Sequence, residues 1–168
     1  MTTPPPALKT VKASQVEMTE LVLPQHTNLL GNLLGGQIMH WMDIACAMAA
    51  IRHMGLVCVT VAVDEISFFE PIRLGDMVIL KSSVNRVFNT SVETGVKVFR
   101  QHRNGEMVHA NTAYFTFVGL DDERKPVSAP PIVPETDDEK RRFDEALFRR
   151  NTRLEHRRAL KQWKERQR

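Results

Sequence analysis

The segment that most constrains the fold of this chain is residues 35–54, which are apolar nearly all round. It opens on Gly35-Gly36, is rich in alanine and methionine, and contains a single acid, Asp43. A helix of about 20 residues is roughly 30 Å long. Because a helix that is apolar all round is buried on most of its sides, we expect a central helix that the rest of the chain surrounds.

The acid and the two glycines of this helix are the first candidate functional residues. An unpartnered buried carboxylate is costly, so Asp43 indicates either a functional group or a carboxylate hydrogen-bonded at a subunit contact. Glycines at a helix start let the backbone N–H groups approach a ligand closely, although a glycine pair also marks an ordinary loop end. The segment therefore predicts an oxyanion-binding helix start and a buried carboxylate.

Strand patterns flank this helix. Asn104-Gly105 stands between two β-type runs, which is a strong hairpin signal. The predicted strands are residues 12–24 before the helix and residues 57–69, 76–88, 90–103 and 106–119 after it. One long helix beside a five-stranded antiparallel sheet predicts an α+β protein with the hotdog fold, in which the sheet wraps around the helix.

The two ends of the chain differ from this central domain, which we place at residues 12–120. Residues 1–11 are expected to form a disordered arm, and residues 121–135 a proline-rich linker. Residues 136–168 are expected to form a charged helix that opens with a capping box from Thr136 to Glu139. A thin apolar stripe on that helix fits either a partly docked, solvated helix or an oligomer contact; it comprises Phe143, Leu147 and Leu154.

Charge and composition exclude several functions. Lys and Arg number 11 against 12 Asp and Glu in residues 1–134, and 12 against 8 in residues 135–168, so the excess positive charge lies in the tail. No nucleic-acid-binding motif accompanies it, and we expect no nucleic-acid partner. No apolar run is long enough to span a membrane, and the N-terminus lacks the features of a secretory signal.

Cysteine and histidine usage points to the cytoplasm and to chemistry without a metal. Two cysteines, Cys46 and Cys58, suit a reducing compartment. Cys46 lies in an apolar helix without a cationic neighbour, so a buried inert thiol is the favoured reading. The six histidines show no metal-ligand spacing, and we expect no metal.

A longer pattern resembles a known family. The segment Asn28-x-x-Gly-Asn-x-x-Gly-Gly, followed by Met42-Asp43, resembles the acyl-CoA thioesterases of the hotdog superfamily. The likeness continues through residues 61–68, Gly75-Asp76 and residues 113–118, and it covers roughly residues 12–145. The resemblance implies hydrolysis of fatty acyl-CoA to free fatty acid and CoA. It also implies homo-oligomers, with hexamers built as trimers of dimers, and no cofactor beyond the CoA of the substrate.

The resemblance also implies a set of site residues. Asn28 and Asp43 fall on the catalytic pair, and Gly36 falls on the backbone donor. Gly36 would stabilise the oxyanion, Asn28 would orient the water or the carbonyl, and Asp43 would act as general base or as nucleophile. Basic groups are expected near the CoA phosphates; the candidates are Arg52, Arg86, Arg100 and Arg103. His53 is a candidate either for those phosphates or for capping its helix.

Helix geometry indicates that one chain does not hold a complete site. Gly36 and Asp43 are seven residues apart, so they share a helix face but lie about 10.5 Å apart along the axis. A thioester carbon and its oxygen are close neighbours, so one helix does not easily serve both. A two-fold dimer that pairs Asp43 of one subunit with the Gly36 and Asn28 region of the other would solve this.

Two alternative functions stay open. A hotdog enoyl-thioester hydratase would use a histidine together with the acid, and no matched histidine motif is present. A non-catalytic module that binds acyl-CoA or a nucleotide would use the same pocket. Acyl chain length also stays open, and the residues expected to influence it are Met39, Trp41, Met42 and Phe68.

Overall fold

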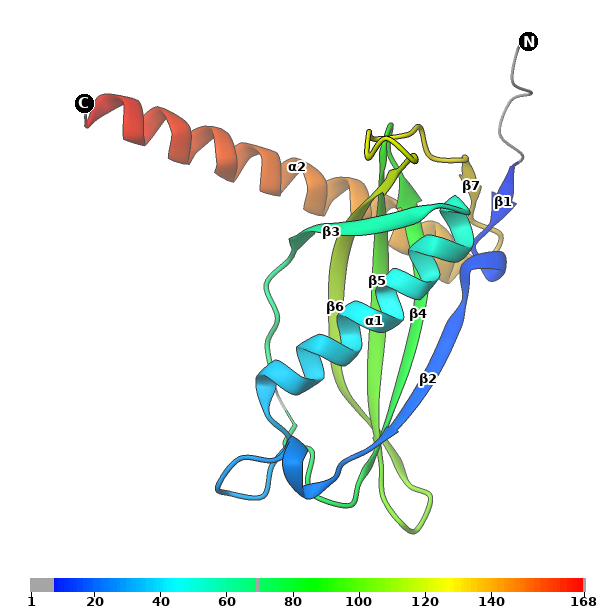
Figure 1. The fold of residues 1–168 in the computed structure, drawn as a ribbon, viewed down its shortest axis with the longest axis vertical. Coiled ribbons are helices and arrows are strands. Elements are labelled where there is room, and N and C mark those ends of the chain that lie inside the picture. The colour runs from blue at the N-terminus through cyan, green and yellow to red at the C-terminus, as the bar shows by residue number, and fades with distance from the viewer. Residues whose placement is uncertain (1–7, 69, 168) are drawn as a thin grey trace.

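The computed structural model describes residues 8–68 and 70–167 of the chain. A five-stranded antiparallel sheet curves around one long helix, α1 (Gly35–Met54), as Figure 1 shows. The strands lie in the order β2-β4-β5-β6-β3. Their bounds are Val16–Leu21 for β2, Val57–Val63 for β3, Met77–Val87 for β4, Ser91–Gln101 for β5 and Met107–Leu120 for β6. The predicted α+β class and hotdog architecture are confirmed.

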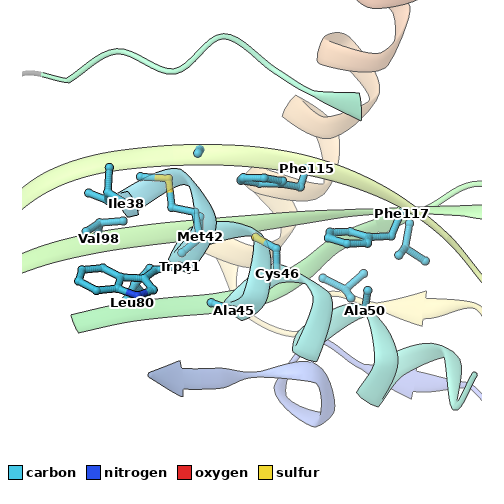
Figure 2. Close-up of a cluster of buried hydrophobic side chains, with 14 of the residues drawn as sticks. Ile38, Trp41, Met42, Ala45, Cys46, Ala50, Leu80, Val98, Phe115 and Phe117 are labelled. Atoms are coloured by element: carbon cyan, nitrogen blue, oxygen red, sulfur yellow. The ribbon is translucent and has the colours of Figure 1, made fainter. Parts of the chain in front are cut away.

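The core fills the space between α1 and the sheet (Figure 2). Met42 and Cys46 of α1 are fully buried, and they belong to the same cluster as Leu80 of β4 and Phe115 and Phe117 of β6. Burying each large apolar side chain contributes about 1.5–3 kcal/mol. Small side chains elsewhere on this face of α1 let the helix lie close to the strands.

The opposite face of α1 is uncovered in the single chain, which corrects the expectation of a helix buried on most sides. Met39 and Ile51 are 41% and 45% exposed, and His40 is also exposed. Asp43 is only half-buried, so its predicted burial is incomplete. The physical reason is that one sheet of five strands curves over one side of the helix and leaves the other side without a partner.

The strand predictions after α1 are confirmed in number and order. Gly105 has a left-handed φ of +88° in the turn between β5 and β6, as a hairpin glycine requires. β3 ends at Val63, earlier than the predicted 57–69, and residue 69 lies outside the described residues. The strand predicted within 12–24 narrows to β2, with a short 3-10 turn on either side of it.

Segments near both ends of the domain pack on its body, which corrects two predicted boundaries. Lys9–Thr10 (β1) pairs in parallel with Ile132–Val133 (β7), and Val11 is 1% exposed. The predicted arm is therefore wrong from residue 9 onward, and residues 1–7 lie outside the described part of the chain. The predicted linker contains β7 and is docked on the domain. The physical reason is that Val11, after β1, and Ile132 of β7 are both buried in the core cluster.

The C-terminal helix α2 (Asp137–Arg166) docks on the sheet face opposite α1 (Figure 1). It opens with the predicted capping box, in which the Glu139 N–H donates to Thr136 Oγ1 at 3.2 Å. Its contact depends on charge more than on the predicted apolar stripe. Arg149 binds the fully buried Glu93 of β5 at 2.6 Å and lies 3.5 Å from the centre of the Tyr114 ring. No helix in the described part of the chain is long and apolar enough to cross a membrane.

His53 is buried near the C-terminal end of α1, and its ring does not cap this helix; its predicted contact with CoA phosphates stays a prediction. Its ring Nε2 lies 2.8 Å from the Pro130 carbonyl, and the residue is 1% exposed. Burial lowers the pKa of His53 below its usual value; the hydrogen bond to Pro130 opposes that shift, and the nearby Lys9 ammonium adds to it. His53 is therefore a buried packing residue that bonds to Pro130.

We expect the free energy of unfolding to fall as the pH drops below about 6.5, because the unfolded chain then binds a proton that folded His53 resists. His53→Gln keeps an N–H donor but does not titrate. It should therefore reduce the pH dependence by up to about 1.4 kcal/mol per pH unit. Urea unfolding across this pH range measures the effect, with His156→Gln on the exposed surface of α2 as the control. Equal slopes for wild type and His53→Gln would contradict this assignment.

Candidate active site

The N-terminal end of α1 presents backbone donors that the helix does not use. No side chain caps this end, and no acid lies in the first turn. The N–H groups of Gln37 and Ile38 donate to the Leu34 carbonyl, whereas no acceptor within the described residues takes those of Gly35 and Gly36. A Cβ added at Gly36 would meet nothing within 4 Å. An open pair of donors at the positive end of a helix dipole suits an anion.

Asn28 lies in the loop that folds back against this helix start. Its side-chain oxygen Oδ1 accepts hydrogen bonds from the N–H groups of Leu30 at 2.9 Å and of Asn32 at 3.1 Å. Leu34 in turn donates to the His26 carbonyl at 2.9 Å, which ties the loop to α1. Because Oδ1 is occupied and the residue is exposed, Asn28 has its amide Nδ2 left to donate to a ligand.

Asp43 is held by a residue that the sequence analysis missed. The Thr60 hydroxyl of β3 donates to Asp43 Oδ1 at 2.7 Å. This hydrogen bond sets the orientation of the carboxylate and leaves Oδ2 without a protein donor among the described residues. Thr60 is the one hydroxyl in the otherwise apolar strand Val57–Val63, and that isolated polar residue was the available signal.

The three predicted site residues do not lie on one part of α1. Gly36 lies at the N-terminal end of α1 and Asn28 lies in the loop before it, whereas Asp43 lies about 10.5 Å further along the helix axis. Asp43 and Thr60 instead lie where the uncovered face of α1 meets β3, which is the free edge of the sheet. A single chain therefore carries two half-sites.

Apolar side chains surround both half-sites and face solvent. Val57, Val59, Val61 and Val63 of the edge strand are 70%, 39%, 52% and 47% exposed. The loop after Asn28 carries two leucines, at positions 29 and 30, that are 106% and 84% exposed. Clusters of exposed apolar side chains of this kind mark interaction sites.

The four arginines predicted to contact CoA are not gathered at one place. Arg86 lies 3.9 Å from the centre of the Phe143 ring and donates to the Phe143 carbonyl, so it anchors α2. Arg52 and Arg100 each donate to a backbone carbonyl elsewhere in the chain, and Arg103 is exposed. Contact with CoA stays a prediction for these residues, and the anchoring role of Arg86 makes it the weakest candidate.

The Cys46 thiol faces the core and is not a nucleophile. Cys46 is fully buried, and burial raises the pKa of its thiol to about 12. This confirms the predicted inert thiol, because the thiolate is the reactive form. Within the described residues no group of three His, Cys, Asp or Glu side chains could hold a metal ion.

Two of the grooves in the described part of the chain bear on the location of the site. One of about 380 Å³ adjoins the N-terminal end of α1 and includes Gly35, Ile38 and Phe68 in its lining. A larger one of about 740 Å³ lies on the outer sheet face beside α2. Its Lys81 pairs with Glu17 at 3.2 Å. Neither groove is lined by Asn28, Gly36 or Asp43, but the smaller groove is lined by Gly35, which directly precedes Gly36, so it is the groove that adjoins the predicted site.

The chain matches known proteins along most of its length. Residues 30–106 match the family model of the thioesterase superfamily. The chain is 38% identical to the uncharacterized acyl-CoA thioester hydrolase YkhA of Bacillus subtilis, over 91% of this chain and 90% of that protein. It is 40% identical to acyl-coenzyme A thioesterase 11 of Mus musculus over 89% of this chain, but it spans only 25% of the mouse protein.

Solved structures agree with these relatives. An acyl-CoA hydrolase from Staphylococcus aureus, in complex with butyryl coenzyme A, coenzyme A and coenzyme A disulfide, superposes with a TM-score of 0.87 at 33% identity, covering 93% of this chain and 96% of that one. Asp43Ala, Asn28Ala and Thr60Ala mutants of the Staphylococcus aureus enzyme also match. An apo-hexameric acyl-CoA thioesterase has a TM-score of 0.86 at 31% identity, covering 89% of this chain and 96% of that one.

Identity at this level over nearly the whole of a single-domain relative, together with close superposition, goes beyond a shared fold. The chain therefore belongs to the thioesterase superfamily and, within it, to the hotdog-fold acyl-CoA thioesterases, which are thioester hydrolases.

Proposed function

We propose that this protein hydrolyses fatty acyl-CoA to free fatty acid and CoA at a site shared by two copies of the chain. The observation that carries the proposal is that α1 bears two kinds of catalytic group at separate places. Asp43 is held by the Thr60 hydroxyl of β3, and the N–H groups of Gly35 and Gly36 are unused at the start of the helix. The complex of the Staphylococcus aureus relative with butyryl coenzyme A supports the substrate class. The predicted cytoplasmic location stays a prediction.

The shared site follows from the division of the catalytic groups and from the exposed apolar surface around them. In a two-fold dimer, Asp43 of one copy would face the Asn28 loop and Gly36 of the other, giving two equivalent sites. The exposed face of α1, the β3 edge and the leucines at positions 29 and 30 would be covered by the same contact. The hexameric relative supports further assembly into a hexamer, which we propose to be a trimer of dimers.

The helix start would stabilise the charge that forms during the reaction. Attack on the thioester carbon pushes electrons onto the carbonyl oxygen, and the Gly36 N–H would donate to that oxyanion. Asn28 would donate from Nδ2, because its Oδ1 already accepts two backbone hydrogen bonds. Losing one such donor typically raises the barrier by roughly 3–4 kcal/mol.

Asp43 would activate the attack, either as general base on a water or as nucleophile. In the first route the carboxylate takes the proton of the water whose oxygen bonds to the carbonyl carbon, and the C–S bond then breaks. CoA leaves as a thiolate, so a strong general acid is less necessary. Water, the carboxylate and the N–H donors supply each step, and we propose that no cofactor takes part.

Replacing either catalytic side chain should abolish most thiol release from acyl-CoA. We expect Asp43→Asn to lower kcat by about 10²–10⁴-fold because it removes the base or nucleophile. Asn28→Ala should lower it by about 10²–10³-fold, as for the loss of an oxyanion donor. Asp122→Asn and Asn151→Ala, at exposed positions, are the matched controls. Full activity in Asp43→Asn, or binding of acyl-CoA without thiol release by wild type, would overturn the proposal.

Mixing two inactive variants tests whether the site is shared. After complete subunit exchange between Asp43→Ala and Asn28→Ala, half of the dimers are mixed, and each has one intact site of two. We therefore expect recovery of about a quarter of the wild-type activity. No recovery despite exchange verified by mass spectrometry would place Asn28 and Asp43 in the same subunit's site.

The hydrogen bond from Thr60 should affect turnover more than binding. Thr60→Val keeps the shape of the side chain but removes its hydroxyl. A hydrogen bond to a charged group contributes about 1.5–3 kcal/mol. We therefore expect kcat to fall by roughly 10–100-fold with little change in KM. Thr60→Ser should restore most of the turnover. Equal kcat in Thr60→Val and wild type would show that Asp43 does not need this orientation.

A further inference from the structure

We infer that the groove beside the N-terminal end of α1 binds the acyl chain next to the thioester, and that Phe68 limits the length of that chain. The inference rests on the proposed thioesterase function and names the substrate class that the site favours. The groove has a volume of about 380 Å³. Ligand pockets range over about 300–1,000 Å³, so we expect short and medium acyl chains to fit best.

The position of the groove follows from the proposed oxyanion donor. Gly35 lines the groove and directly precedes Gly36, and consecutive Cα atoms lie about 3.8 Å apart. A carbonyl oxygen bound at the Gly36 N–H would therefore lie one residue from the lining of the groove. The chain attached to that carbonyl would then run toward the groove, whose lining does not include Asp43.

The lining of the groove suits hydrocarbon. Three of its lining residues are buried apolar side chains: Ile38 of α1, Ile72 of the loop before β4, and Ala110 of β6, which are 3%, 4% and 4% exposed. The polar residues of the lining are the half-buried Asn32, the exposed Glu70 and Asn111, which is 2% exposed. An acyl chain gains free energy on such apolar side chains in proportion to the area removed from water. The pantetheine arm of CoA carries amides, which lose hydrogen bonds when they are buried against apolar side chains.

Phe68 forms one wall of the groove, and hydrogen bonds to the neighbouring backbone fix its position. It is 51% exposed, and its ring atom Cε2 lies 3.9 Å from the position of a Cβ added at Gly35. The backbone carbonyls on either side of it are fixed: Ser67 accepts from the Asn111 side chain, and Pro71 accepts from Arg100 at 2.7 Å. Phe68 is therefore positioned to close the groove over the start of α1.

The lining of the groove shows which of the four residues expected to influence chain length can contact an acyl chain bound there. Trp41 and Met42 are 5% and 0% exposed, belong to the core and do not line this groove, and Met39 lies on the uncovered face of α1. Only Phe68 of these four lines the groove.

The test is the rate of thiol release from butyryl-, octanoyl-, lauroyl- and palmitoyl-CoA by the intact protein. We expect Phe68→Ala to raise kcat/KM for palmitoyl-CoA relative to butyryl-CoA by about tenfold, because a methylene in an apolar pocket typically changes discrimination by at least that factor. Ala110→Leu places a larger side chain in the lining of the groove and should lower kcat/KM for palmitoyl-CoA relative to butyryl-CoA. Phe148→Ala, which removes an exposed phenylalanine of α2, is the matched control and should leave the profile unchanged.

Free CoA separates this assignment from a pantetheine site. The Kd of CoA should stay within about twofold of wild type in Phe68→Ala, since CoA has no acyl chain. An unchanged chain-length profile in folded Phe68→Ala, or a loss of affinity for CoA and for every acyl-CoA alike, would overturn the inference while thioesterase activity stands. Absence of thiol release by wild type from all four substrates would instead overturn the proposed function, and the groove assignment with it.

Discussion

The packing of α1 against the inner face of the sheet is the interaction on which the rest of this structure depends. Met42 and Cys46 fit against Phe115 and Phe117 because small side chains elsewhere on the helix let it approach the strands. The sheet must curve to follow a helix of 20 residues, and this curvature leaves one helix face and the β3 edge uncovered. Both half-sites lie on the surface that this packing leaves free.

The outer face of the sheet is organised by charge instead of by apolar packing. Glu93 is fully buried under α2 and is paired with Arg149 and Asn85. A buried carboxylate of this kind is tolerated because its hydrogen bonds are satisfied, and removing one partner would leave an uncompensated charge. Arg153 of α2 also pairs with Asp64, immediately beyond β3, so α2 helps hold the strand that carries the Asp43 partner.

The division of the site has a simple origin in helix geometry. A backbone oxyanion donor is available only at the start of a helix, whereas a carboxylate that pairs with the edge strand must lie further along it. One α1 does not bring both groups to the same carbonyl, but two antiparallel copies can. The same exposed apolar surface that weakens a lone chain would then stabilise the dimer that completes the site.

Local features of this chain were determined by the sequence itself. The bounds of α1, the capping box at Thr136 and the hairpin at Asn104-Gly105 depend on residues within a few positions of one another, and all were predicted. Asn28, Gly36 and Asp43 came from a pattern that resembles a family. Tertiary structure alone decided the partners that are distant in sequence: Thr60 for Asp43, Glu93 for Arg149 and Pro130 for His53. Spacing along a chain does not encode such pairs, because only the curvature of the sheet around α1 and the docking of α2 bring them into contact.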